Sequence, residues 1–198
     1  MQFDPKQLKA IIEQRRSIFP KDYTSERVDD IIIEEMLENA NWAPTYGKTE
    51  PWRFTVFTGE GLRKLAEFQS NLYKSKSTAA GNFNEKTFEK LSNNPLKASH
   101  VVGIGMKRDP AGKIKEIEEI EAVACAVQNM YLTATAYGVG CYWGSGGITY
   151  LEEAKPFFGL EPEDKFLGFL YIGKPAIEWP TGFRKPIAEK VTWILKDQ

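Results

Sequence analysis

One helix-forming segment, from about residue 116 to residue 137, limits the folds that this chain can adopt. Its second half, AVACAVQNMYLTATAYG, is apolar or small on nearly every side. A helix with that pattern has no face for water, so we expect it to be buried in the core or at a contact between subunits. Gly138 follows it as a helix stop signal.

The segments around this helix alternate between helical and strand-like spacing of apolar residues. Three further helices are expected to start at Asp4 and near residues 24 and 62, and strands to cover residues 52–57, 100–107, 139–143 and 165–175. Strands separated by helices, without a regular strand–helix–strand repeat, predict an α+β fold with helices packed on one sheet.

Two segments are less regular. Residues 74–95 are polar and rich in Asn and Ser, which predicts a mobile excursion with one short helix around residues 88–91. The sequence leaves open whether this excursion forms a lid. The tail alternates Val191, Trp193 and Leu195, which predicts a strand that closes its own sheet or adds to the edge of a neighbour's sheet. We favour the second arrangement.

Composition excludes several classes of function. The 198 residues carry 26 basic and 27 acidic side chains, a balance that does not favour nucleic acid or an anionic membrane as partner. No signal peptide, membrane-spanning run, repeat or linker is visible, so we expect one domain, residues 1–198, in the cytoplasm. The single histidine, His100, rules out a multi-histidine zinc site and is expected to cap a strand. Cys125 and Cys141 are expected to be buried, reduced thiols.

The motif RRS at the end of the first helix is a candidate anion site. Arg15 and Arg16 offer planar guanidinium groups and Ser17 a hydroxyl, a set that suits a phosphate or a carboxylate. The alternative is a solvated basic helix end that the helix dipole favours.

The stretch NWAPTYGKTEPWRF, residues 41–54, connects a helix to a strand with two prolines, a glycine and two tryptophans. The prolines and Gly47 fix an irregular backbone, which allows Tyr46, Lys48 and Glu50 to point into a cavity. The alternative is a well-ordered turn whose two tryptophans pack inward.

Two later stretches complete the set. In GVGCYWGSGG, residues 138–147, a strand runs into small residues that let backbone N–H groups approach a ligand closely. In GKPAIEWPTGFRKP, residues 173–186, Arg184 and Lys185 stand just before a proline. Taken alone, the first favours a tight turn and the second an ordinary surface connection.

The order of these motifs is more specific than any one of them. A helix ending in RRS is followed by AP-x5-EPW-x-F, then by G-x-G-x-x-W-G-S-G, then by a strand ending in GKP that precedes RKP. In this order, over nearly its whole length, the chain resembles the nitroreductase family of FMN-dependent oxidoreductases and is similar to its small single-domain members.

The resemblance implies a nitroreductase-like α+β fold with a central, mainly antiparallel or mixed sheet, and a homodimer whose C-terminal strand is exchanged. It implies FMN at the subunit interface, with residues 41–54 lining the flavin from the partner's side, and NAD(P)H as the reductant. No metal and no catalytic side chain is implied. The implied cofactor-binding residues are Arg15, Arg16, Ser17 and Arg184 at the phosphate and ribityl chain, Tyr46, Lys48 and Glu50 at the ring, and Trp143, Gly144 and Ser145 near flavin N5.

The chain departs from the family's pattern at three positions. Phe19 stands where many members carry Arg or Lys near flavin N1 and O2, where negative charge develops on reduction. Glu50 replaces a common glutamine, and Lys48 a common asparagine or serine. Unless Lys48 or Arg16 substitutes, a phenylalanine at that position is expected to stabilise reduced flavin less.

The expected function follows from the resemblance. Hydride passes from reduced nicotinamide through flavin N5 to an electron-poor acceptor such as a nitroaromatic, a quinone or an enone. Three alternatives stay open. They are dehalogenation or flavin-consuming chemistry, a flavin-binding or flavin-storage protein with little turnover, and a dimeric scaffold without cofactor.

Overall fold

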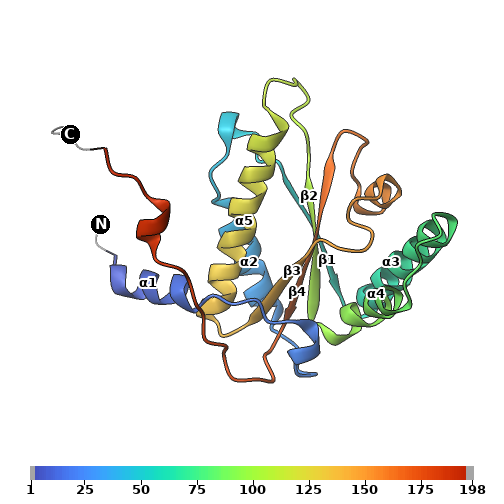
Figure 1. Cartoon of the computed structure of the whole chain (residues 1–198), viewed down its shortest axis with the longest axis horizontal. Coiled ribbons are helices and arrows are strands. Elements are labelled where there is room, and N and C mark those ends of the chain that lie inside the picture. Colours follow the sequence, from blue (N-terminus) through green and yellow to red (C-terminus); the bar gives the residue numbers. More distant parts are fainter. Residues whose placement is uncertain (1–2, 195–198) are drawn as a thin grey trace.

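The structure is a computed structural model that describes residues 3–194 (Figure 1). Helices and strands alternate in it without a regular repeat, as the spacing of apolar residues predicts. The longer elements are α1 (Pro5–Gln14), α2 (Asp30–Asn41), β1 (Trp52–Thr58), α3 (Glu60–Ala79), α4 (Glu85–Lys97), β2 (His100–Met106), α5 (Glu116–Ala136), β3 (Gly140–Gly144) and β4 (Lys165–Gly173). Four short 3-10 turns, η1 (Pro20–Asp22), η2 (Tyr46–Lys48), η3 (Glu152–Phe158) and η4 (Ile187–Lys190), complete the described elements.

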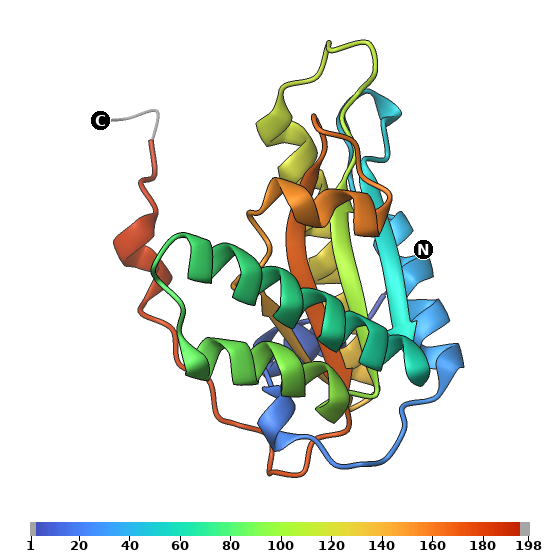
Figure 2. The same cartoon turned by 90° about the vertical axis from the view of Figure 1, so that its right-hand side faces the viewer.

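The four strands form one sheet in the order β1-β2-β4-β3, and every neighbouring pair is antiparallel. Helices α2 and α5 cover one face, and α3 and α4 cover the other (Figures 1 and 2). Successive side chains of β2 point to opposite faces of the sheet, so the strand contributes to the hydrophobic cores on both faces. Val102 and Ile104 join the core under α5, while Val101 joins the core under α3. The α+β prediction is therefore confirmed, with a purely antiparallel sheet.

Helix α5 is the central helix that the sequence predicts. Val123, Ala126, Val127 and Met130 are fully buried against the sheet and α2. Gly138 has a φ of +66°, a conformation that favours glycine, and it ends the helix as expected.

The two thiols differ in their surroundings. Cys141 on β3 is buried, and burial raises the pKa of its thiol above the usual range. Cys125 is exposed, so the prediction of two buried thiols is wrong for this residue.

Two helix predictions need correction. The second helix begins at Asp30 rather than near residue 24, because Val28 donates its N–H to Ser99 Oγ across the fold, at 2.8 Å, in an extended segment. Asp29 then caps the helix by accepting a hydrogen bond from the N–H of Ile31.

The segment 74–95 is also more ordered than predicted. It contains the last turns of α3 and most of α4, which form an antiparallel helical pair on the sheet (Figure 2). Buried Gln69 ties the pair together, because its Nε2 donates to the carbonyl of Leu91 at 2.6 Å. Asn84 is one of the polar residues that suggested a loop. It is the N-cap of α4, and its side chain accepts a hydrogen bond from the N–H of Thr87.

The predicted tail strand does not form in the described part of the tail. Residues 187–190 make the turn η4, and residues 191–194 have no regular structure and are exposed. Leu195, the last residue of the predicted pattern, lies outside the described residues. Within residues 3–194 the tail pairs with no strand of the sheet, and its apolar side chains Ile187, Val191 and Trp193 are exposed.

His100 is the first residue of β2 and is almost fully buried. Its Nε2 lies 2.8 Å from Asp30 Oδ1, and its Nδ1 lies 2.9 Å from Ser99 Oγ. Burial lowers the pKa of the imidazole, and this effect outweighs the attraction of Asp30, which acts in the opposite direction. The folded protein therefore favours the neutral ring.

A pH-dependent loss of stability follows from His100. Because its pKa is lower in the folded than in the unfolded chain, its contribution is fully present above about pH 6.5 and is lost as the pH falls below that value. We expect the free energy of unfolding to decrease between pH 7.5 and pH 5, before most carboxylates titrate. Urea denaturation at several pH values measures this slope. His100→Gln removes the protein's one imidazole, and the same slope in that variant would contradict the assignment.

Candidate functional site

The motif RRS lies beside the edge strand β3. After α1 ends, the N–H of Ile18 donates to the carbonyl of Cys141 at 2.9 Å, and Ser17 forms an isolated parallel bridge with Cys141. Buried Ile18 fixes this segment against the core. The flanking Arg15 and Ser17 are thereby placed next to the C-terminal half of α5.

Four of the predicted site residues meet in one pocket. We call this cavity of about 480 Å³ the Arg15–Trp143 pocket. It collects side chains from the N-terminal motif, α5, β3 and the loop after it, and β4. Its lining residues are Arg15, Ser17, Ile120, Tyr131, Trp143, Ser145, Tyr150 and Leu167.

Arg15 is held in this pocket by an aromatic ring. Its Cζ lies 5.4 Å from the centroid of the Tyr131 ring, a cation–π contact. Within residues 3–194 its guanidinium makes no ion pair and no hydrogen bond by the usual geometric criteria. Its N–H donors are therefore free for a ligand anion.

Trp143 is fixed at two atoms. Its backbone N–H donates to the Tyr131 hydroxyl at 2.6 Å, and its indole Nε1 donates to the carbonyl of Leu167 at 2.9 Å. Burial raises the pKa of Tyr131 to about 12, so this phenol is neutral at physiological pH. The indole and the neutral phenol give the pocket a rigid aromatic wall.

The glycines after Trp143 allow close backbone packing. A Cβ on Gly168 of β4 would lie only 2.3 Å from the carbonyl oxygen of Gly144, and Gly168 has a φ of +110°. Both facts require glycine at position 168. The backbone of Gly144 and Ser145 is consequently held against β4, at the rim of the pocket.

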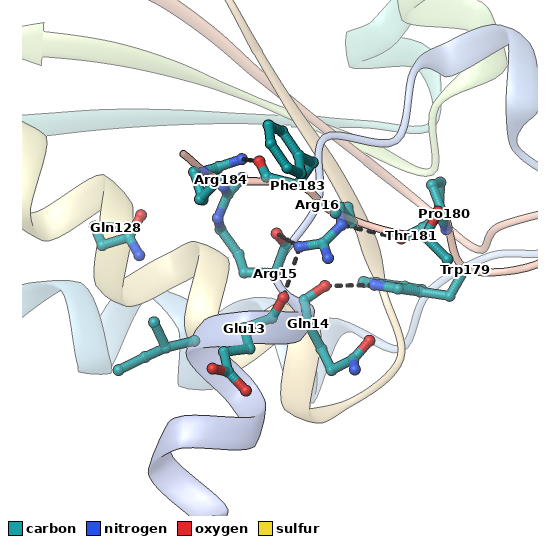
Figure 3. Close-up of a pocket in the computed structure, with 12 residues that line it drawn as sticks. Glu13, Gln14, Arg15, Arg16, Gln128, Trp179, Pro180, Thr181, Phe183 and Arg184 are labelled. Carbon is teal, nitrogen blue, oxygen red and sulfur yellow. Dashed lines mark hydrogen bonds between the residues drawn. The ribbon is translucent and has the colours of Figure 1, made fainter. Parts of the chain in front are cut away.

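A second cavity, the Arg16–Arg184 pocket, adjoins the first because Arg15 lines both (Figure 3). Its volume is about 670 Å³, and α1, α5 and the C-terminal segment surround it. Arg15, Arg16 and Arg184 give this cavity three cationic side chains, against one carboxylate, that of Glu13. Such a balance favours an anionic ligand.

Arg16 differs from Arg15 in its contacts. Its Nε donates to the carbonyl of Pro180 at 2.9 Å, and its Nη1 donates to the carbonyls of Glu13 and Arg15 (Figure 3). The guanidinium also lies against Gly182, where an added Cβ would come within 1.9 Å of Nη2. Arg16 thus fastens the C-terminal segment beside the pocket, together with Trp179, whose indole donates to the carbonyl of Gln14.

The structure does not bring the 41–54 stretch to either pocket. Tyr46, Lys48 and Glu50 are exposed, and they lie near Ile114 at the N-terminal end of α5. Arg15 lies at Tyr131, about four turns further along the helix, so the two groups are roughly 20 Å apart in one chain. The alternative prediction was a turn whose two tryptophans pack inward. It is confirmed for Trp52, which is buried, and wrong for Trp42, which is 79% exposed.

The backbone of that stretch is unusual. Lys48 and Glu50 have φ values of 56° and 44°, in the left-handed region that residues other than glycine rarely adopt. Conformations of this kind cost free energy and cluster at functional sites.

Phe19 does not line the Arg15–Trp143 pocket. Its ring packs on Tyr142, with centroids 4.5 Å apart, on the side of β3 that faces α4. No cationic side chain takes its place among the residues that line this pocket, apart from Arg15.

Comparison with known proteins identifies the family. A model described as "Nitroreductase family" matches residues 12–174. The chain belongs to the nitroreductase family. The Bacillus subtilis protein YfhC, which bears the name of an NAD(P)H nitroreductase, is 32% identical over 190 residues, which cover 93% of each chain.

Solved nitroreductase-family structures share the fold. A nitroreductase-like protein from Bacillus cereus superposes with a TM-score of 0.80 at 30% identity and covers 98% of both chains. A nitroreductase-type protein from Desulfovibrio desulfuricans, crystallised in complex with FMN, has a TM-score of 0.69 at 25% identity, with coverage of 98% and 99%. The expected nitroreductase-like fold is therefore confirmed.

The sequence reading missed four residues of the pocket. Ile120, Tyr131, Tyr150 and Leu167 line it, and none of them belongs to a motif. Tyr131 carried little signal, because its hydroxyl is one of several polar groups in that half of the central helix, with Gln128, Asn129 and Thr133 among them. The other three carried none, since single apolar or aromatic residues are common in any core.

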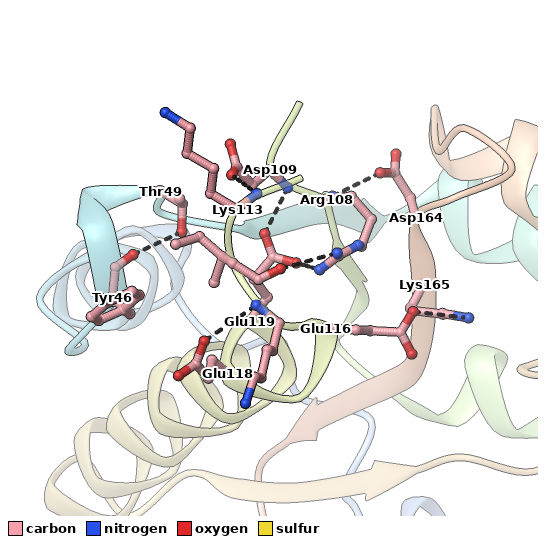
Figure 4. A network of polar contacts seen from close by, with 12 residues as sticks. Tyr46, Thr49, Arg108, Asp109, Lys113, Glu116, Glu118, Glu119, Asp164 and Lys165 are labelled. Atoms are coloured by element: carbon pink, nitrogen blue, oxygen red, sulfur yellow. Dashed lines mark hydrogen bonds and ion pairs between the residues drawn. The ribbon is translucent and has the colours of Figure 1, made fainter. Parts of the chain in front are cut away.

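A polar network fixes the opposite end of α5 (Figure 4). Arg108 pairs with buried Glu119, and Asp109 donates its N–H to the same carboxylate at 2.6 Å. Asp164 accepts from the N–H of Arg108 at 2.9 Å and thereby ties the start of β4 to this loop.

None of the helices in the described residues combines the length and the hydrophobicity that a bilayer crossing needs.

Proposed function

We propose that this chain is an FMN-dependent NAD(P)H oxidoreductase that reduces an electron-poor acceptor such as a nitroaromatic, a quinone or an enone. One observation carries the proposal. Arg15 and Ser17 from the N-terminal motif meet Trp143 and Ser145 from β3 and its loop in one pocket of about 480 Å³. The family membership and the FMN-bound relative support the same activity.

The side chains in the two pockets suit FMN. A phosphate requires cations and N–H or O–H donors, which Arg15, Ser17 and Arg184 offer. A flat ring requires apolar and aromatic walls, which Ile120 and the Trp143 indole supply. The cavities, of about 480 and 670 Å³, have the size of typical cofactor sites.

The proposed binding residues keep most of the predicted set. Arg15, Ser17 and Arg184 hold the phosphate and ribityl chain, and the backbone from Trp143 to Ser145 lies along the ring. Arg16 has a different role in this proposal, because most of its donors already bind backbone carbonyls. It fastens the segment that carries Arg184.

Bound FMN would supply two-electron hydride chemistry. In the overall reaction, NAD(P)H gives up a hydride and becomes NAD(P)⁺, and the acceptor gains that hydride and a proton from water. The chain's own residues bind and orient the reactants, and the neutral Tyr131 phenol keeps negative charge out of the pocket.

We also propose that the chain works as a homodimer, with residues 1–198 as one domain. Helix α1 has no buried residue, and Leu8 and Ile12 on its apolar stripe are exposed. Phe183 and Trp193 of the C-terminal segment are exposed as well. A second chain covering these surfaces would let the tail reach its partner.

A dimer would also explain why the residues expected at the flavin ring lie apart from the Arg15–Trp143 pocket of their own chain. Tyr46, Lys48 and Glu50 line neither pocket in one chain. Residues 41–54 of the partner subunit would complete the pocket instead.

Steady-state kinetics test the proposed activity. With dioxygen excluded, purified protein supplied with FMN is expected to turn over NADH or NADPH only when a quinone or a nitrofuran is present, and to lose this activity when FMN is removed. Tight FMN binding without turnover would favour the storage alternative. A monomer that binds no FMN would contradict the proposal.

A further inference from the structure

Tyr131 contacts two residues that line the Arg15–Trp143 pocket. Its ring lies 5.4 Å from the Arg15 Cζ, and its hydroxyl oxygen accepts the Trp143 N–H at 2.6 Å. Tyr131 is only 6% exposed and belongs to α5, which the core holds on several sides.

We propose that Tyr131 is a positioning residue for this pocket, whose ring fixes the Arg15 guanidinium and whose hydroxyl fixes β3 at Trp143. The inference deepens the proposed function and rests on it, because the groups that Tyr131 positions are those assigned to FMN.

The ring can fix Arg15 without blocking it. A carboxylate partner would occupy the N–H donors of the guanidinium, whereas contact with a ring face leaves the in-plane donors free. Arg15 makes no ion pair within residues 3–194. The guanidinium is thus held in place and remains available to a phosphate.

The hydroxyl satisfies a donor at the edge of the sheet. β3 pairs with β4 on one side, and on the other side the Ser17–Ile18 segment reaches it only at Cys141. The Trp143 N–H is bound by Tyr131, beyond that bridge. Trp143 is held by two hydrogen bonds, from its backbone N–H to Tyr131 and from its indole to the carbonyl of Leu167. Loss of the Tyr131 hydroxyl would remove the first and leave the second.

Two variants separate the ring from the hydroxyl in titrations of flavin-free protein with FMN and with riboflavin. Tyr131→Phe keeps the ring, and we expect it to weaken binding of both flavins by about fivefold, the size of one hydrogen bond. Tyr131→Leu also removes the cation–π contact. We expect it to lower the preference for FMN over riboflavin by about tenfold, because only FMN carries the phosphate that Arg15 binds. Tyr142→Phe, which removes a hydroxyl from β3 at the residue before Trp143, should change neither affinity.

Amide hydrogen exchange at Trp143 gives a readout that needs no flavin. In Tyr131→Phe this amide is expected to exchange at least about tenfold faster than in the parent, while the amides paired between β3 and β4 keep their protection. The proposal is overturned if both variants bind FMN and riboflavin as the parent does, or if the Trp143 amide is unaffected. If the parent binds neither flavin, the proposed function fails, and the exchange rate alone then decides whether Tyr131 positions β3.

Discussion

Replacing Arg15 by alanine is expected to weaken FMN binding by about 10- to 100-fold. Hydrogen bonds to a charged group contribute about 1.5–3 kcal/mol, and each 1.4 kcal/mol is a factor of ten in affinity. Arg15 lines both pockets, and its donors are unoccupied in the described chain. Its removal should therefore act on the ligand and leave the fold unchanged.

Equilibrium titration of flavin-free protein with FMN measures the effect. Arg63→Ala is the matched control, because Arg63 is an exposed arginine on α3 that pairs only with Glu60 on the surface. We expect the control to bind FMN as the parent does. Retention of FMN by Arg15→Ala at the parent's affinity would show that the phosphate assignment is wrong.

The contrast between the two arginines shows what a motif can and cannot predict. RRS predicts a local concentration of positive charge, which the structure confirms beside both pockets. It does not predict that Arg16 donates to the carbonyl of Pro180, which is 164 residues away in sequence. Contacts of this range depend on the path of the whole chain.

The core and the strands were predictable for a different reason. The burial of a helix that is apolar nearly all round, or of a strand such as HVVGIGM, can be inferred from the segment's own residues. A helix from near residue 62 and a short one around residues 88–91 were predicted, but the full length of α3 and α4 was not, because polar Asn and Ser read as loop residues until their capping bonds are seen.

The exposed aromatic residues of the tail and of residues 41–54 have a common explanation in the proposed dimer. Trp193 is 80% exposed and Tyr46 is 66% exposed, although both are costly to leave in water. Within residues 3–194 neither side chain is covered. In the proposed dimer these exposed aromatic side chains would be covered by the second copy, so their surroundings cannot be derived from one chain's own contacts.

The other large effect concerns stability, at the end of α5 opposite to Arg15. Glu119 is 1% exposed, and its carboxylate accepts hydrogen bonds from Arg108 and from the N–H of Asp109. Arg108 also donates to the carbonyl of Ile114 at 3.1 Å, so the ion pair closes the loop that leads into α5. Breaking a buried pair leaves an uncompensated charge in a poorly solvated site.

Glu119→Gln is therefore expected to lower the free energy of unfolding by about 3–5 kcal/mol, because the amide cannot neutralise Arg108. Chemical denaturation measures the loss, and thermal unfolding should shift by about 10 °C for a chain of this size. Glu13→Gln is the matched control, since its pair with Lys9 is exposed at 3.7 Å and should contribute little. Equal stability of the two variants would mean that the buried pair contributes no more than a surface pair. A specific loss in Glu119→Gln would establish that this network anchors α5, the helix on which Tyr131 and both pockets depend.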